Sequence, residues 1–384
     1  MGEAVLHLLR PAAGGMGRHV GLLAPALAEA GWEVTLAGPS DFLARLEGAE
    51  GHPRLLRRAV EVPARPSPAA LAAARRQLAA LLAEGGYRLL HLHGTAALLV
   101  AAPLLRSLPA GRRPALAVTL HNLPAERGLL SGLGYRWLER RLLSLHPLWF
   151  AVSPLVREEA IRWWGLPPGQ VELLPAPLEP PRQARAELPS AWQWEPVYIV
   201  GTAARLVPGK GLETLLEAAA RLAPRMPELR LWLVGDGPLR QPLRRQAEAA
   251  GLAGRLRWEG AVPDAAPYLG AMDCVVVPSR VEALSLTALE ALARARPLVV
   301  STAVARTGVV EPGRTGWSFP TGDAAALAAV LRQVREQGDE AARRAARGAE
   351  ETLRRHGLGR AVERVEAGYR KLLDGTADRP AARG

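Results

Sequence analysis

Short apolar segments alternate with longer amphipathic segments along most of the chain. The apolar segments of the first half have the length of buried strands and lie at 4–9, 33–37, 89–93, 115–120, 148–152 and 171–174. Those of the second half lie at 197–200, 231–234, 258–260, 274–277 and 298–300. Ala- and Leu-rich segments with helical periodicity separate them. This alternation predicts an α/β protein with doubly wound parallel sheets.

A proline-rich stretch without periodicity interrupts the alternation at 175–196. Such a stretch is typical of a linker between domains, and 384 residues are enough for two domains that each bury a core. We predict an N-terminal domain at 1–178, the linker at 179–196, a C-terminal domain at 197–357, a helix at 358–374 that crosses back to the N-terminal domain, and a disordered tail at 375–384.

The composition is typical of a soluble globular protein, with 49% hydrophobic and 22% charged residues. The longest apolar run, near 94–105, is interrupted by Pro103 and ends at Arg106, so we expect no segment that spans a bilayer. The first residues show neither a basic region nor a cleavage site, which argues against secretion and favours the cytoplasm. With a single cysteine, Cys274, we expect no internal disulfide.

The formal net charge of +12 is compatible with three kinds of partner or with none. Nucleic acid, anionic lipid and phosphorylated ligands would all be attracted to such a chain. The basic residues are scattered and form no RNA-binding signature, so we do not expect nucleic acid. The charge favours a basic face in peripheral contact with the inner face of an anionic membrane. An ordinary solvated surface is the default alternative.

Lysine and asparagine are almost absent, which draws attention to the positions where they remain. The chain holds two lysines, Lys210 and Lys371, and one asparagine, Asn122. Lys210 and Arg205 flank a glycine turn between a strand and a helix. Two cations and the free amides of a helix N-terminus favour a diphosphate at this loop. We therefore interpret the loop as a phosphate site rather than a solvated turn.

A second loop carries two carboxylates in the stretch 278–297. Glu282 lies in the loop that follows the strand 274–277, and Glu290 lies eight positions later in a helix. The helix N-terminus would attract a phosphate, and carboxylates beside it could accept hydrogen bonds from sugar hydroxyls. From this stretch alone, we favour an ordinary strand-helix-strand crossover with one solvent-facing glutamate and one glutamate in the helix.

The first half offers weaker candidates at the ends of its strands. Gly14 and Gly15 follow the first strand, but their spacing matches neither the dinucleotide fingerprint nor the P-loop. His93 and His121 end two later strands, where the ligands of open α/β sheets bind. For His93 a turn histidine is an equal alternative, whereas Asn122 beside His121 favours a function. We expect no metal at either, since no set with ligand spacing surrounds them.

Together these features resemble the GT-B glycosyltransferases. More narrowly, the chain resembles the retaining family 4, which includes sucrose synthase, bacterial mannosyltransferases and many polysaccharide and lipid glycosyltransferases. The resemblance covers almost the whole chain, and it implies two Rossmann-like domains that face a central cleft. Its motifs are Pro278-Ser279 ahead of Glu282 and Glu290, Arg205 with Lys210-Gly211, the run 233–238, Gly14-Gly15, and the run 313–316 with Gly322-Asp323.

The resemblance implies how a donor would bind. Arg205 and Lys210 would hold the diphosphate of a nucleoside-diphosphate sugar, with the backbone amides of Leu286 and Thr287 completing the site. The donor is then a co-substrate, no other cofactor is needed, and no metal is obligatory. The acceptor would be a sugar, a lipid or a polysaccharide of the cell envelope. The expected stereochemical outcome is retention.

The remaining roles also follow from the resemblance. Glu282 would bind hydroxyls of the donor sugar, and Glu290 would bind the nucleotide ribose. From the N-terminal domain, His121 would approach the far hydroxyl of the sugar and Gly15 the phosphate or the acceptor.

Several glycines of the family pattern are replaced in this chain. Ala283 and Ser285 stand in the loop after Glu282, and Val304-Ala305 replace a glycine pair. These changes motivate one alternative to a glycosyltransferase, which is a non-catalytic sugar-nucleotide-binding partner. A nucleotide-sugar epimerase on a similar scaffold is a second alternative, and the Arg205–Lys210 loop together with the two glutamates argues against it. The sequence does not identify the donor sugar and its base, the acceptor or the oligomeric state.

Overall fold

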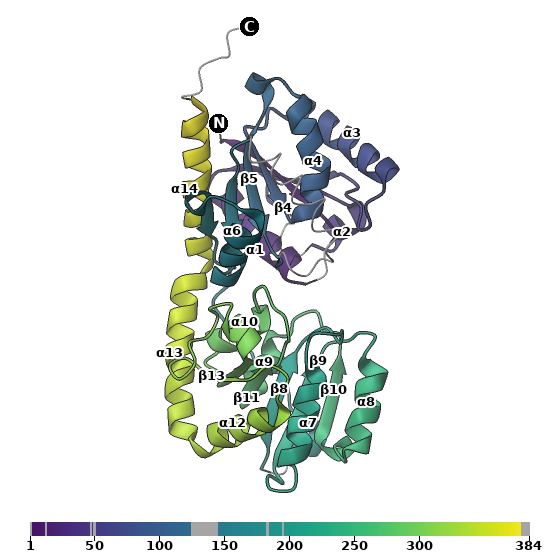
Figure 1. Ribbon diagram of the computed structural model, residues 1–384, viewed down its shortest axis with the longest axis vertical. Coiled ribbons are helices and arrows are strands. Elements are labelled where there is room, and N and C mark those ends of the chain that lie inside the picture. Colours follow the sequence, from purple (N-terminus) through teal and green to yellow (C-terminus); the bar gives the residue numbers. More distant parts are fainter. Residues whose placement is uncertain are drawn as a thin grey trace. The chain divides into compact units, whose positions relative to one another are not determined.

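The computed structural model describes residues 2–11, 14–46, 48, 51–123, 145–181, 184–193 and 196–377. The chain forms two compact units, of which unit 1 comprises 1–179 with 356–384 and unit 2 comprises 180–355. Each unit is built around a parallel β-sheet with helices packed on it (Figure 1). The predicted α/β class with two Rossmann-like domains is confirmed. The central cleft between them stays a prediction.

The sheet of unit 1 has the strand order β3-β2-β1-β4-β5-β6-β7, and all its neighbouring pairs are parallel. Its strands are β1 (Ala4–Leu9), β2 (Glu33–Gly38), β3 (Leu55–Ala59), β4 (Leu89–His93), β5 (Ala115–Leu120), β6 (Leu148–Ala151) and β7 (Val171–Leu173). The apolar pattern did not predict β3. As an edge strand it exposes alternate residues and contains Arg57 and Arg58, so it lacks the continuous apolar run of a central strand.

The helices of unit 1 include one from the C-terminal end of the chain. They are α1 (Gly15–Glu29), α2 (Ser40–Ala44), α3 (Pro68–Gly85), α4 (Thr95–Ser107), α6 (Pro154–Trp164) and α14 (Leu358–Ala377). The helix α14, yellow in Figure 1, contacts α1 and β5. Its residues Ala361, Val365 and Tyr369 are fully buried in the core of unit 1. Residues 375–377, which we assigned to a disordered tail, are helical.

The sheet of unit 2 has the order β10-β9-β8-β11-β12-β13, again entirely parallel. Its strands are β8 (Tyr198–Ala203), β9 (Leu229–Val234), β10 (Leu256–Gly260), β11 (Cys274–Val277), β12 (Leu298–Ser301) and β13 (Trp317–Phe319). Its helices are α7 (Leu212–Leu222), α8 (Arg240–Ala249), α9 (Ala266–Ala271), α10 (Leu286–Ala293), α11 (Thr302–Ala305), α12 (Ala324–Glu336) and α13 (Gly338–His356), the last ending at the boundary between the units.

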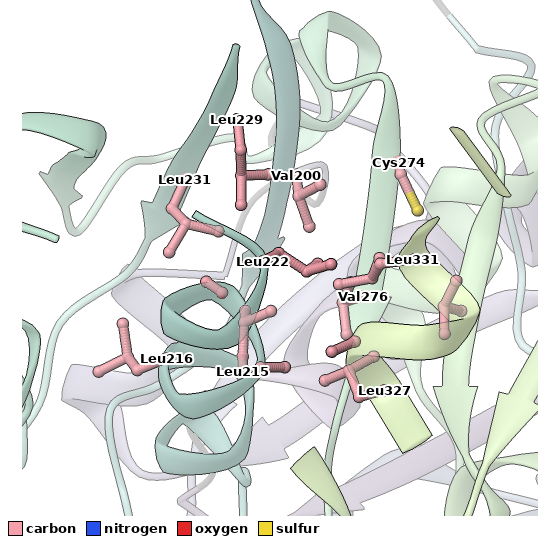
Figure 2. Packing of buried hydrophobic residues seen from close by; sticks show 14 of the residues in the cluster. Val200, Leu215, Leu216, Leu222, Leu229, Leu231, Cys274, Val276, Leu327 and Leu331 are labelled. Carbon is pink, nitrogen blue, oxygen red and sulfur yellow. The ribbon is translucent and has the colours of Figure 1, made fainter. Parts of the chain in front are cut away.

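The core of unit 2 lies between its sheet and the helices α7 and α12. Val200 of β8 and Val276 of β11 point from the sheet toward Leu215 of α7 and Leu327 of α12 (Figure 2). All four side chains are fully buried. Burial of these apolar rows fixes both helices on one face, which holds the loops at the ends of β8 and β11 on a rigid base.

Candidate functional site

The candidate donor site lies where the strand order of unit 2 reverses. The chain passes from β8 outward to β9 and β10, and then returns to the other side of β8 to form β11. The loops that leave β8 and β11 therefore diverge to α7 and α10 from neighbouring strand ends. In open α/β sheets, ligands bind at the carboxyl ends of the strands at such a reversal. These are the loops that the sequence selected.

Lys210 and Glu282 meet at this point. Lys210 Nζ lies 2.7 Å from Glu282 Oε2, and the two side chains are 27% and 14% exposed. The pair is therefore shielded from water but still reachable by a ligand. Arg205 is exposed and has no side-chain partner among the described residues. The structure brings Lys210 and Glu282 together from 72 residues apart and leaves Arg205 available beside them in the same loop.

Glycines allow the two loops to approach each other closely. Gly211 has a φ of +68°, and a Cβ at this position would lie 2.0 Å from the carbonyl oxygen of Pro278. Next to it, the backbone N–H of Arg280 donates to the carbonyl of Gly209 at 2.8 Å. This contact between backbones sets the separation of Lys210 from Glu282.

Replacement of Gly211 by alanine is expected to disturb this site. The left-handed conformation alone costs roughly 1–3 kcal/mol for a residue with a Cβ, and the collision with Pro278 adds to that. Gly209→Ala is the matched control, because Gly209 has a φ of +89° but no atom within 4 Å of the added Cβ. Urea denaturation should show a larger loss of unfolding free energy for Gly211→Ala than for Gly209→Ala. Equal losses in the two variants would contradict the close contact between the loops.

The N-terminus of α10 faces the same loops with free amides. Ser285 caps the helix by accepting a hydrogen bond from the N–H of Ala288 at 3.2 Å. The N–H groups of Leu286 and Thr287, in the first turn, have no acceptor within the helix. The hydroxyl of Thr287 donates to the carbonyl of Ala203 at 2.7 Å, which ties α10 to the end of β8. Two amides and the positive end of the helix dipole thus lie where a phosphate would be favoured.

The residues that replace family glycines have structural roles. Ser285 supplies the cap of α10, which typically contributes about 1 kcal/mol. Val304 is fully buried within the short helix α11. The hydroxyl of Ser301, which caps that helix, donates to the carbonyl of Ser279 at 2.5 Å. Ser285 and Val304 are thus part of the framework around the loop that carries Glu282.

Glu290 lies in the second turn of α10 and is 5% exposed. It belongs to the same helix whose N-terminus faces the Lys210 loop, about one turn beyond the free amides. Its predicted contact with a ribose is not tested by this geometry and stays a prediction.

In unit 1 the predicted residues lie at the carboxyl end of the sheet. Gly15 is the first residue of α1, and the preceding Gly14 caps the helix without a side-chain hydrogen bond. His121 follows β5 and is half-buried. With its amide suitably oriented, Asn122 donates to the carbonyl of His121 and accepts from Arg10, both at 3.0 Å. The lone asparagine therefore anchors the backbone beside His121.

The structure also reveals a buried histidine cluster that the sequence analysis missed. His7 of β1 and His91 of β4 are register partners, and His93 follows two residues later on the same face. One ring nitrogen from each of these three lies within 4.8 Å of the others. The expectation that no such set surrounds His93 is wrong. The spacing at 91 and 93 already places both on one face of a strand, but the partner strand was not known.

Burial keeps this cluster uncharged. It lowers the pKa of His7 to about 3, with a contribution from His19, and lowers that of His19 to about 4. The pKa values of His91, His93 and His121 lie well below 6.5 for the same principal reason. Ring nitrogens of His7, His91, His93 and His121 are hydrogen-bonded to one another or to Tyr369, whereas Nε2 of His19 has no partner among the described residues. The imidazoles are therefore neutral at pH 7.

Family models match both units. The model described as Glycosyltransferase Family 4 matches residues 13–181, and the model described as Glycosyl transferases group 1 matches residues 197–337. The chain belongs to the group 1, family 4-like glycosyltransferases. The predicted resemblance is thereby confirmed, and the GT-B fold with it.

Individual relatives agree with this family. LpsE of Rhizobium meliloti (strain 1021), a lipopolysaccharide core biosynthesis glycosyltransferase, is 35% identical over 40% of this chain and 44% of its own. The phosphatidyl-myo-inositol mannosyltransferase of Mycolicibacterium smegmatis is 29% identical over 89% of this chain and 86% of its own. The chain spans about half the length of LpsE and of the similar LpsD.

Solved structures support the fold. Anabaena Alr3699/HepE in complex with UDP superposes with a TM-score of 0.80 at 18% identity, covering 96% of this chain and all of that one. At such identity the likeness speaks for the GT-B fold alone. Among the described residues of this family 4-like chain, no helix has the length and apolar composition needed to cross a membrane. Contact with an anionic membrane stays a prediction.

Proposed function

We propose that the protein transfers a sugar, with retention of configuration, from a nucleoside-diphosphate sugar to a lipid, sugar or polysaccharide acceptor of the cell envelope. The observation that carries the proposal is the Lys210–Glu282 pair, 2.7 Å apart at the strand reversal of unit 2. In a nucleoside-diphosphate sugar the diphosphate is bonded directly to the sugar. A cation for the diphosphate and a carboxylate for the sugar hydroxyls would therefore have to lie side by side, as Lys210 and Glu282 do.

The positive groups would stabilise the leaving group. As the bond from the anomeric carbon to the diphosphate breaks, negative charge grows on the phosphate oxygens. Lys210, the neighbouring Arg205 and the amides of Leu286 and Thr287 lie at the loops that would receive these oxygens. Because these donors are fixed before the reaction, they stabilise the charge with little reorganisation. We propose that they supply the required positive charge without an obligatory metal.

Glu282 would hold the sugar. Its carboxylate accepts a hydrogen bond from Lys210 through one oxygen, Oε2, and a carboxylate has further lone pairs for sugar hydroxyls. Lys210 would then bridge the diphosphate and Glu282, which couples the position of the sugar to that of its leaving group. His121 and Gly15 would approach from unit 1.

Homologues named as glycosyltransferases of lipopolysaccharide and of phosphatidyl-myo-inositol support an envelope acceptor. The structure of HepE with UDP supports a nucleoside-diphosphate donor. No relative among them suggests an epimerase.

A panel of UDP- and GDP-sugars tests the proposal. A donor at about a hundredfold excess over its Kd should raise the melting temperature of unit 2 by roughly 5–10 °C. With an acceptor, the same donor should release nucleoside diphosphate, and NMR should show the anomeric configuration retained in the product. Binding without transfer or hydrolysis would favour a non-catalytic partner, and acceptor-independent isomerisation of the donor an epimerase. Absence of binding across the panel would contradict the proposal.

A further inference from the structure

A continuous line of hydrogen bonds runs through the interior of unit 1 and ends at His121. It begins at a threonine of β5, passes through a tyrosine of α14 and crosses three buried imidazoles. Its links are Thr119 Oγ1 to His91 Nε2 at 2.7 Å, His91 Nδ1 to Tyr369 OH at 2.6 Å, Tyr369 OH to His7 Nε2 at 3.2 Å, His7 Nδ1 to His93 Nε2 at 3.0 Å, and His93 Nδ1 to His121 Nε2 at 3.1 Å.

Each imidazole of this line carries a single proton at neutral pH. Burial lowers the pKa values of the histidines and raises that of Tyr369, so none of the rings is charged. A neutral imidazole donates from one nitrogen and accepts at the other. Because both nitrogens of His7, His91 and His93 are engaged in the line, the direction of one hydrogen bond determines the direction of the next.

Thr119 determines that direction. Its side chain is fully buried, and its hydroxyl has one partner among the described residues, the Nε2 atom of His91. If Thr119 accepted from His91, its own O–H would be a buried donor without an acceptor, which is costly. Thr119 therefore donates, and in every following link the donor is the partner nearer to Thr119 along the line. Each ring thus carries its proton on the nitrogen that points away from Thr119. The last donor is His93 Nδ1, and the last acceptor is His121 Nε2.

We propose that Thr119, His91, Tyr369, His7 and His93 act as positioning residues that hold His121 in its Nδ1–H tautomer. Under this arrangement His121 offers a hydrogen-bond donor, not a lone pair, from the ring nitrogen that the line leaves free. The functional consequence rests on the proposed function, in which His121 meets a hydroxyl oxygen of the donor sugar. The tautomer itself does not depend on that function.

A metal ion is the competing explanation for the cluster. The nitrogens of His7, His91 and His93 are close enough to share one, and neutral imidazoles suit Zn²⁺. However, both nitrogens of each ring already have hydrogen-bond partners within the line. Coordination would replace at least two of these bonds, so the two explanations make opposite predictions for the ring protons.

The tautomers can be measured directly on the full-length protein without donor or acceptor. Long-range ¹H–¹⁵N spectra of histidine-labelled protein at pH 7.5 should show His7, His91, His93 and His121 with the proton on Nδ1. Loss of one signal set in His121→Gln assigns that residue. An Nε2–H form of His121, or exchange between both forms, would overturn the proposal, as would stoichiometric Zn²⁺ binding with loss of the Nδ1–H signals.

Two tyrosine variants test whether the line is continuous in solution. Tyr369→Phe deletes one oxygen and keeps the ring in the core, so the ¹⁵N shifts of His7 and His91 should change. Tyr87→Phe is the matched control, since it removes a hydroxyl of unit 1 that bonds Thr35 at 3.1 Å, outside the line. Equal spectra for Tyr369→Phe and the wild-type protein would contradict a hydrogen-bond line that is continuous through Tyr369.

His93→Leu removes the last donor and tests the consequence for the site. His121 should then populate both tautomers, and sugar transfer should fall about tenfold, the scale of one hydrogen bond between neutral groups. Unchanged tautomers would overturn the positioning role. If the tautomers change but transfer does not, the positioning role of the line stands, and the proposed contact between His121 and the sugar is contradicted. This variant therefore separates the two hypotheses.

Discussion

Lys210→Ala is expected to lower the release of nucleoside diphosphate by about 10²–10³-fold, the usual effect of removing one fixed charge-stabilising donor. The ammonium lies 2.7 Å from Glu282 and is only 27% exposed, so water cannot readily replace it. Its loss also leaves Glu282, at 14% exposure, without its cationic partner. We expect most of the effect in kcat/KM.

Lys371→Ala is the matched control, because Lys371 is the other lysine of the chain. It pairs with Glu172 at 3.3 Å on the surface of unit 1 and is 64% exposed, so its removal should change neither transfer nor stability by much. Glu282→Ala should reduce transfer to a similar extent as Lys210→Ala, and the double variant should lose less than the product of both effects. Full activity of Lys210→Ala would refute the phosphate site.

The second large effect is a loss of stability of unit 1 as the pH falls. Unit 1 should lose about 4 kcal/mol of unfolding free energy between pH 7 and pH 5 from His7 and His19 alone. Their pKa values, about 3 and about 4, lie below the 6.5 of the unfolded chain. Below pH 6.5 the unfolded chain therefore binds protons that the folded unit does not. Stability falls as the pH falls, and the lowered pKa values of His91, His93 and His121 add to the loss.

The distribution of histidines provides an internal control. All eight lie in unit 1, and the residues 180–355 of unit 2 contain none. Hydrogen exchange followed by mass spectrometry at pH 5 should therefore show β1, β4 and β5 opening before β8, β9 and β11. His19→Leu, whose Nε2 has no partner among the described residues, should recover about 2 kcal/mol at pH 5. Earlier opening of unit 2 would contradict the conclusion that the buried histidines cause the loss of stability in acid.

Much of the fold was accessible from the sequence because local rules decide it. Buried parallel strands need nearly continuous apolar runs, and amphipathic helices between them need a helical period, so ten or so strands could be placed by inspection. The edge strand β3 escaped because exposed arginines interrupt its pattern. The loops that carry Arg205, Lys210 and Glu282 were found because each joins a strand end to a helix N-terminus, which is where ligands of open α/β sheets bind.

The tertiary structure alone decided which of these side chains meet. Lys210 and Glu282 touch because the strand order reverses between β8 and β11 and because Gly211 admits the backbone of Pro278. The sequence contains neither the order of the strands nor the collision that a Cβ would cause.

The histidine line illustrates the same limit more strongly. His7, His91 and Thr119 come from different strands, and Tyr369 arrives on α14 from the far end of the chain. Sequence determines each residue's face on its own strand, through the alternation of side chains. Which faces become neighbours depends on strand order, register and helix docking, and these are set by how the whole unit buries its apolar surface.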